Sequence, residues 1–183
     1  GTSTDGTTWT ARTSGVTGNL WGLCWDGSLY HAMGSGIHLT STNAITWSAI
    51  SQYPSGFGLP SCAMYGTSSF VVGDSSGNIA TTTDAITWGT PQTTGTASTI
   101  NVITQGLGIY VAGASSGYIA TSTNASTWTA RTNPVLNLGF SAGTFGTLFM
   151  LAGSFGGIVT STDGITWAKK PNPFPNTQIL FTD

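Results

Sequence analysis

Short runs rich in Val, Ile, Trp, Tyr and Phe alternate along the chain with clusters of Gly, Ser, Thr, Asn and Asp. Such runs, bounded by turn-forming residues, are typical of β-strands. They predict strands at Leu20–Trp25, Ser28–Met33, Ile37–Thr42 and Ile45–Ile50, then at Ser61–Tyr65, Ser69–Val72, Asn78–Thr83 and Ile86–Gly89. Two further groups begin around Ile100–Thr104 and Leu138–Ala142. The pattern predicts an all-β chain made of repeated groups of four strands.

An octapeptide marks each repeat. It has the form Thr-Ser/Thr-Thr-Asp/Asn-Gly/Ala-x-Thr-Trp and occurs at 2–9, 40–47, 81–88, 121–128 and 160–167. Its tryptophans, at positions 9, 47, 88, 128 and 167, are therefore 38, 41, 40 and 39 residues apart. A period near 40 with four strands per unit is typical of the blades of a β-propeller. We therefore expect four-stranded antiparallel blades that stack on one another.

The termini predict how the ring closes. Blade repeats span about 20–50, 60–90, 99–130 and 138–169 of a single domain, residues 1–183. The ends of the chain, 1–13 and 177–183, match parts of one further blade that lacks its second strand. We expect five blades, with the incomplete one shared by the two termini. The alternative is a piece of a longer chain with more blades.

The octapeptide resembles the Asp-box, the repeat of bacterial neuraminidases and other sialidase-like propellers. The family pattern Ser-x-Asp-x-Gly-x-Thr-Trp is matched by Ser3, Asp5, Thr8 and Trp9, with one residue fewer before the Thr. Asn replaces the Asp at Asn43 and Asn124. The resemblance implies a divergent relative in which the motif lies on the turn between the third and fourth strands of each blade.

We expect the motif to serve the fold. An Asx side chain in a tight turn accepts hydrogen bonds from the backbone N–H groups that follow it, and the Trp offers a large surface for burial between blades. The alternative, calcium binding or catalysis at these turns, has less support. The predicted structural pairs are Asp5 and Trp9, Asn43 and Trp47, Asp84 and Trp88, Asn124 and Trp128, and Asp163 and Trp167.

Charge is nearly absent, which excludes several functions. Charged residues make up 5% of the chain, with four basic side chains and a net charge of −2. Such a chain cannot neutralise a phosphate backbone, so we expect no nucleic-acid partner. No run of 18 apolar residues is present, so we expect no membrane insertion. Two histidines cannot complete a zinc site alone, and we expect no metal and no cofactor.

The sialidase resemblance implies three substrate-binding arginines, a Tyr nucleophile with its Glu, and an Asp acid/base. This chain has two arginines, both in predicted outer strands, and no Glu. Glycosidases in general need a positioned carboxylate pair, whereas Asp26 and Asp74 are expected on opposite faces of the propeller. We therefore predict no catalytic residues and no enzymatic activity.

Binding is expected on the face that carries the variable connections between blades, because loops on a rigid scaffold commonly hold binding sites. Aromatic rings beside hydroxyl and amide groups suit the C–H faces and hydroxyls of sugar rings. The alternative is that these aromatics fill the blade junctions as core. The candidate ligand-binding residues are Trp21, Tyr53, Phe57, Asp74, Phe155 and Phe174.

Blade one has unusual residues. His38 aligns with Ile79, Ile119 and Ile158 of the other blades, and we interpret it as a core histidine rather than a ligand. Cys24 and Cys62 fall one residue apart in the aligned repeats, so their side chains should point to opposite faces, which makes a disulfide doubtful.

The leading hypothesis is a non-catalytic binding module, exposed outside a cell or on a virion as in phage tail fibres and adhesins. It would recognise a surface glycan or another cell-surface receptor. The alternative is a structural component of a virion or surface complex that holds neighbouring subunits and binds no small ligand.

Overall fold

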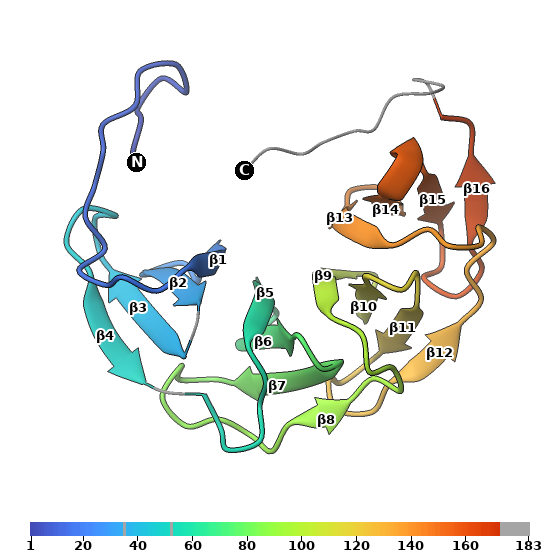
Figure 1. Cartoon of the computed structure of the whole chain (residues 1–183), viewed down its shortest axis with the longest axis horizontal. Coiled ribbons are helices and arrows are strands. Elements are labelled where there is room, and N and C mark those ends of the chain that lie inside the picture. The colour runs from blue at the N-terminus through green and yellow to red at the C-terminus, as the bar shows by residue number, and fades with distance from the viewer. Residues whose placement is uncertain (35, 52, 173–183) are drawn as a thin grey trace.

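A computed structural model describes residues 1–34, 36–51 and 53–172. Within them, four antiparallel sheets of four strands each follow one another along the chain and form an arc (Figure 1). The first strand of each sheet lies toward the centre of the arc and the fourth toward its rim. The strands are β1 (Leu20–Trp25), β2 (Tyr30–Gly34), β3 (Ile37–Ser41) and β4 (Ser48–Ser51); β5 (Pro60–Gly66), β6 (Ser69–Asp74), β7 (Asn78–Thr82) and β8 (Gln92–Thr93); β9 (Ile100–Gly106), β10 (Ile109–Ala114), β11 (Ile119–Ser122) and β12 (Thr129–Arg131); and β13 (Phe140–Phe145), β14 (Phe149–Gly153), β15 (Ile158–Ser161) and β16 (Ala168–Lys170).

The fourth strand of the second blade differs from the prediction. It was expected at Ile86–Gly89, but β8 contains only Gln92–Thr93. In the third blade, the residue three positions after the motif Trp is Arg131, which pairs with Ile119. The same position in the second blade is Pro91, which has no N–H for the ladder, so pairing resumes one residue later with Ile79 opposite Gln92. In the first blade, the expected strand at 45–50 begins at Ser48 because Ile45 and Thr46 belong to the Asx turn.

The turn motif is built as expected. Asn124 Oδ1 accepts hydrogen bonds of 2.9 Å from the backbone N–H groups of both Ser126 and Thr127. The other four copies repeat these two bonds at their own Asx residue. At Asp163, hydrogen bonds from the Thr166 and Ile165 N–H groups lower the pKa of the carboxyl group to about 2. In this copy the ionised carboxylate therefore accepts the same two backbone hydrogen bonds as the Asn side chain.

The core consists of three hydrophobic clusters, each lying between two adjacent blades. The later blade contributes large aromatic rings and the earlier one contributes smaller or aliphatic side chains. Between the third and fourth blades, Phe149 and Trp167 pack with Val111 and Ile119. Between the second and third, Tyr110 and Trp128 pack with Val71 and Ile79 in the same way. Between the first and second, Phe70 and Trp88 pack with Met33.

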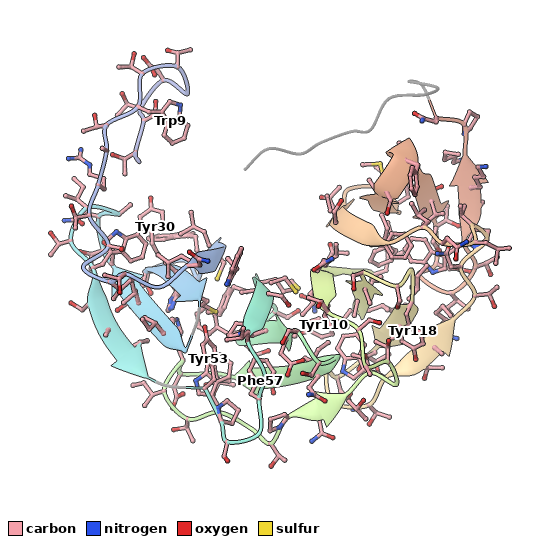
Figure 2. All side chains as sticks on the ribbon, in the orientation of Figure 1. Trp9, Tyr30, Tyr53, Phe57, Tyr110 and Tyr118 are labelled. Carbon is pink, nitrogen blue, oxygen red and sulfur yellow. The ribbon has the colours of Figure 1, made fainter. Side chains whose placement is uncertain are left out.

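The N-terminal copy of the motif stands apart from these sheets. Thr2 and Thr10 form an isolated antiparallel bridge, and Figure 1 shows this segment extending beyond the first blade. Trp9 is 65% exposed (labelled in Figure 2), whereas Trp167 is 6% exposed. The strand expected at 177–183, which would complete this blade, lies outside the described residues, so the fifth blade stays a prediction.

Candidate ligand-binding face

The connections between blades lie beside the turns that join the second and third strands, and backbone hydrogen bonds tie the two together. Ser75 N–H donates to Leu59 O at 2.8 Å, and Ser115 N–H donates to Thr99 O at 2.9 Å. Ser154 N–H makes the same bond to Gly139 O at 2.9 Å. The variable connections are thus fixed to the rigid sheets, which gives this face a preorganised surface.

A β-bulge interrupts the first strand of every blade at the same position. Pairing skips one residue between Leu20 and Gly22, and the same irregularity recurs in β5, β9 and β13. A bulge turns one side chain out of the regular alternation, and bulges are common beside binding sites. We call the four skipped residues the bulge ring: they are Trp21, Ser61, Asn101 and Ser141.

Two members of the bulge ring are used to connect blades. Ser61 Oγ donates to Ile100 O at 2.6 Å, and Asn101 Nδ2 donates to Phe140 O at 2.8 Å. Each bond therefore reaches the strand that begins the next blade. Trp21 makes no hydrogen bond of this kind within the described part of the chain, and its side chain is 54% exposed. Trp21 is thus the large, outward-facing member of the ring.

Trp21 lines a cavity of about 270 Å³. Ser61 and Asn101 of the bulge ring line it too, together with the exposed Leu59 and hydroxyl groups of the second and third blades. Its lining combines an indole face, aliphatic surface, hydroxyls and one amide, and includes no charged side chain. The full lining is Trp21, Leu59, Pro60, Ser61, Ser75, Thr99 and Asn101.

Tyr53 and Phe57 are part of the junction between the first two blades as well as of the surface. Figure 2 shows them close together, and their ring centroids are 5.8 Å apart. Both are half-buried against the core cluster there. The Tyr53 hydroxyl donates to Ile37 O at 3.2 Å, and burial raises the pKa of this phenol. Both rings line a shallow cavity of about 480 Å³ that shares Leu59 with the Trp21 cavity.

Asp74 was expected to face a ligand, but the structure places it in the interior. It is completely buried, and its carboxylate accepts hydrogen bonds from Ser76, Asn78 and Gly58. The carboxylate therefore holds the β6–β7 turn and the preceding connection in place. We withdraw Asp74 from the candidate ligand-binding residues.

The candidate Phe155 is not brought to Trp21. Phe155 is 74% exposed in the β14–β15 turn, with a positive φ of 57°, and lines neither cavity. Phe174 lies outside the described residues. Sequence reasoning missed Leu59 and Asn101 as parts of the site. Aligning the repeats places Asn101 at the position of Trp21, so the sequence could have indicated that the two residues are equivalent. The bulge that turns both residues outward depends on strand register, which the sequence does not show.

The described residues contain no cluster of three or more His, Cys, Asp or Glu side chains suited to a metal ion. No helix in this part of the chain is long and apolar enough to span a membrane. Cys24 and Cys62 are both free thiols. His38 is fully buried, as the core interpretation requires.

Known proteins share the fold but little sequence. No protein-family model and no curated protein sequence matches the chain. The chain is similar to the structure of YCF48 bound to a D1 peptide, with a TM-score of 0.66 and 20% identity over 92% of this chain and 60% of that one. It is also similar to virginiamycin B lyase from Staphylococcus aureus with quinupristin, with a TM-score of 0.76 and 13% identity over 90% of this chain and 59% of that one.

These similarities confirm the predicted all-β propeller architecture, represented here by four complete blades. The blades resemble those of the YCF48 and virginiamycin B lyase propellers. A streptogramin B lyase structure matches equally well in fold, with a TM-score of 0.74 and 13% identity over 90% of this chain and 57% of that one. The chain thus spans about three fifths of the length of these propellers. At such identities the likeness concerns the fold alone.

Proposed function

We propose that this chain is a non-catalytic binding module that recognises a surface glycan at the Trp21 cavity. The observation that carries the proposal is the bulge ring: where two other blades use this position to connect to their neighbour, Trp21 presents an exposed indole. An aromatic face beside hydroxyls and an amide suits the stacking and hydrogen bonding of a sugar ring. The uncharged lining favours a neutral sugar.

The absence of charge at both cavities also supports a binding role over catalysis. No carboxylate lines either one, whereas glycoside hydrolysis requires two. We regard the five turn motifs as divergent Asp-box repeats that serve the fold. A glycan-binding propeller of this composition is proposed to act outside a cell or on a virion surface, without nucleic-acid partners, membrane insertion or cofactors.

A glycan array compares the wild-type chain with Trp21→Ala and Trp25→Ala. Trp25 is the matched control because it lies on the same strand with similar exposure, 46%, and lines neither cavity. We expect selective binding that weakens at least tenfold in Trp21→Ala and is retained in Trp25→Ala, a loss typical of a central aromatic contact. Equal binding by all three chains, or none by the folded wild type, would contradict the proposal.

The second candidate function is assembly with neighbouring subunits, and the open face of the first blade favours it. Leu23 and Trp25 are exposed there, beside a cavity of about 450 Å³ whose lining includes Trp21, Leu23, Tyr30 and Trp47. Exposed apolar surfaces of this kind are typical of interfaces. Light scattering should then detect association that Leu23→Ser weakens and that Leu59→Ser, a change outside this cavity, leaves unchanged. A wild-type chain that stays monomeric at high concentration would argue against this candidate.

A further inference from the structure

Both histidines of the chain lie in one buried hydrogen-bonded series. Asp26 Oδ2 is 2.9 Å from His31 Nε2, and His31 Nδ1 is 2.9 Å from His38 Nε2. The two rings are almost completely buried, with 2% and 0% exposed. His38 Nδ1 has no hydrogen-bond partner within the described residues. Neither the proposed ligand site nor the turn motifs use these groups.

The series lies at the junction between the first and second blades. The His31 ring is 4.2 Å from the Phe70 ring, and the His38 ring is 6.0 Å from the Trp88 ring, measured between centroids. Strand register aligns His31 with Val71 and Val111 in the next two blades. His38 aligns with Ile79 and Ile119 in the same way. Two ionisable rings thus replace the aliphatic side chains that fill the other junctions.

The hydrogen bonds limit how many protons the His31–His38 pair can bind while the bond between the two rings is kept. With both rings neutral, His31 donates to Asp26 and accepts from His38, which leaves His38 Nδ1 as an unpartnered acceptor. One added proton at His38 Nδ1 can be relayed: His38 passes its Nε2 proton to His31, whose positive charge then faces the Asp26 carboxylate. A second added proton makes both facing nitrogens donors. The bond between the rings must then break, and an uncompensated charge remains among aromatic side chains.

Few other ionisable groups face the pair. Asp26 lies in the β1–β2 turn and faces His31. Cys24 on β1 lies opposite His31 in the strand register, and the Tyr53 ring packs against the Trp88 ring. Tyr65 on β5 packs at a tilt against Phe70. Burial raises the pKa of Cys24 to about 12 and also raises that of Tyr53, so both stay neutral below pH 7. Although burial opposes it, hydrogen bonds from Leu29, Ser28 and His31 hold the pKa of Asp26 below its usual range, so it stays ionised.

We infer that the Asp26–His31–His38 series is an acid-sensitive joint, in which uptake of a second proton by the histidine pair opens the junction between the first and second blades. Burial, together with the nearby His31, lowers the pKa of His38 to about 4 from an ordinary value of 6.5. The unfolded chain therefore binds more protons than the folded one between these values. The stability that depends on a neutral His38 is therefore fully present above pH 6.5 and is lost as the pH falls toward 4.

The test measures unfolding between pH 7 and pH 4.5, a range above the ordinary titration of carboxyl groups. The double variant His31→Val, His38→Ile installs the side chains that the second and third blades carry at these positions. We expect the unfolding constant of the wild type to rise at least tenfold over this range and that of the double variant to change less than twofold. Equal pH dependence in the two chains would overturn the inference.

Two further measurements keep the test decisive if the double variant folds poorly. The chain has only two histidines, so nuclear magnetic resonance of the wild type assigns every imidazole titration to this pair. We expect one ring to remain neutral to below pH 5, and two rings titrating above pH 6 would refute the inference. Hydrogen exchange, corrected for its intrinsic rate, should lose protection in β2 and β3 at pH 5 and keep it in β14 and β15. A uniform loss would contradict a local joint.

Discussion

At the level of the residue, a single Asx side chain holds each turn of the repeated motif. Removing the Asx acceptor leaves two backbone N–H groups without their partner, so Asn124→Ala is expected to destabilise the chain by about 1–2 kcal/mol. Asn124→Asp keeps the acceptor oxygen and, because Asp163 fills the same place in the next blade, should stay within about 0.5 kcal/mol of wild type. Denaturant midpoints at pH 7 compare the three chains. A loss in Asn124→Asp as large as that in Asn124→Ala would contradict this role.

The residue after the Asx has a left-handed backbone, which costs an L-residue about 1–2 kcal/mol. Ala44 and Ala125 both adopt it, with φ of 57° and 56°. Ala125 is buried in a core cluster, whereas Ala44 is half-buried beside the open face of the first blade. We expect Ala44→Gly to raise the thermal midpoint by relieving strain, and Ala125→Gly to gain less because it also loses a buried methyl group. The reverse order would show that packing at Ala125 is unimportant.

Residue types alone predicted the Asx turns, the buried His38 and the exposed Trp21, because each of these departs from or defines the repeat. They did not predict the partners of Asp74. A carboxylate in a Ser-rich turn is expected to be exposed, but the connection that contains Gly58 covers it. The series from Asp26 to His38 was also missed. Its spacing brings the two rings together only through the pairing of β2 with β3.

At the level of the strand, one Pro shortens a sheet. Pro91 stands where Arg131 pairs in the third blade, so Pro91→Arg is expected to extend β8 toward Gly89, whose N–H already bonds to Thr81 O at 2.9 Å. Hydrogen exchange should detect a newly protected amide at position 91. Gln92→Arg adds the same charge without restoring an N–H and serves as the control. An unprotected amide at position 91 would mean that another residue blocks the pairing.

The two faces of a single strand predict opposite sensitivities. Phe149 is fully buried between the third and fourth blades, while its neighbour Met150 points to the open face of the fourth. Phe149→Ala is expected to cost about 3–5 kcal/mol, and Met150→Ala less than about 1 kcal/mol. Denaturant unfolding followed by circular dichroism measures both. Similar losses would indicate that the outer face of the fourth blade is covered.

Strand assignments from sequence were good at the inner three strands and poor at the outermost one. Inner strands follow runs of Val, Ile and Phe, whereas the fourth strand begins only after the motif Trp, at a residue that composition does not mark. The bulges in β1, β5, β9 and β13 could not be predicted, because a bulge is a property of the pairing between two strands and leaves no distinct composition.

In the described part of the chain the four sheets form a row, and the main contacts between sheets join neighbours. Inner blades have two junctions and end blades have one, so the second and third blades should open last. Native-state hydrogen exchange is expected to find the slowest amides in β6, β7, β10 and β11 and faster ones in β2 and β14. Identical rates across all four blades would indicate a single cooperative unit instead.

Two of the three junctions in this row pair aromatic rings of one blade with aliphatic side chains of the blade before it, whereas the first places His31 and His38 against the rings. Because the second and third sheets carry both halves of this contact, a copy of either one is able to follow either one. Duplication or loss of a gene segment of about 40 codons would therefore add or remove a blade without requiring new contacts. The unit on which evolution acts in this chain is then the whole repeat, and blade number is free to vary among descendants while the surface around Trp21 is inherited intact.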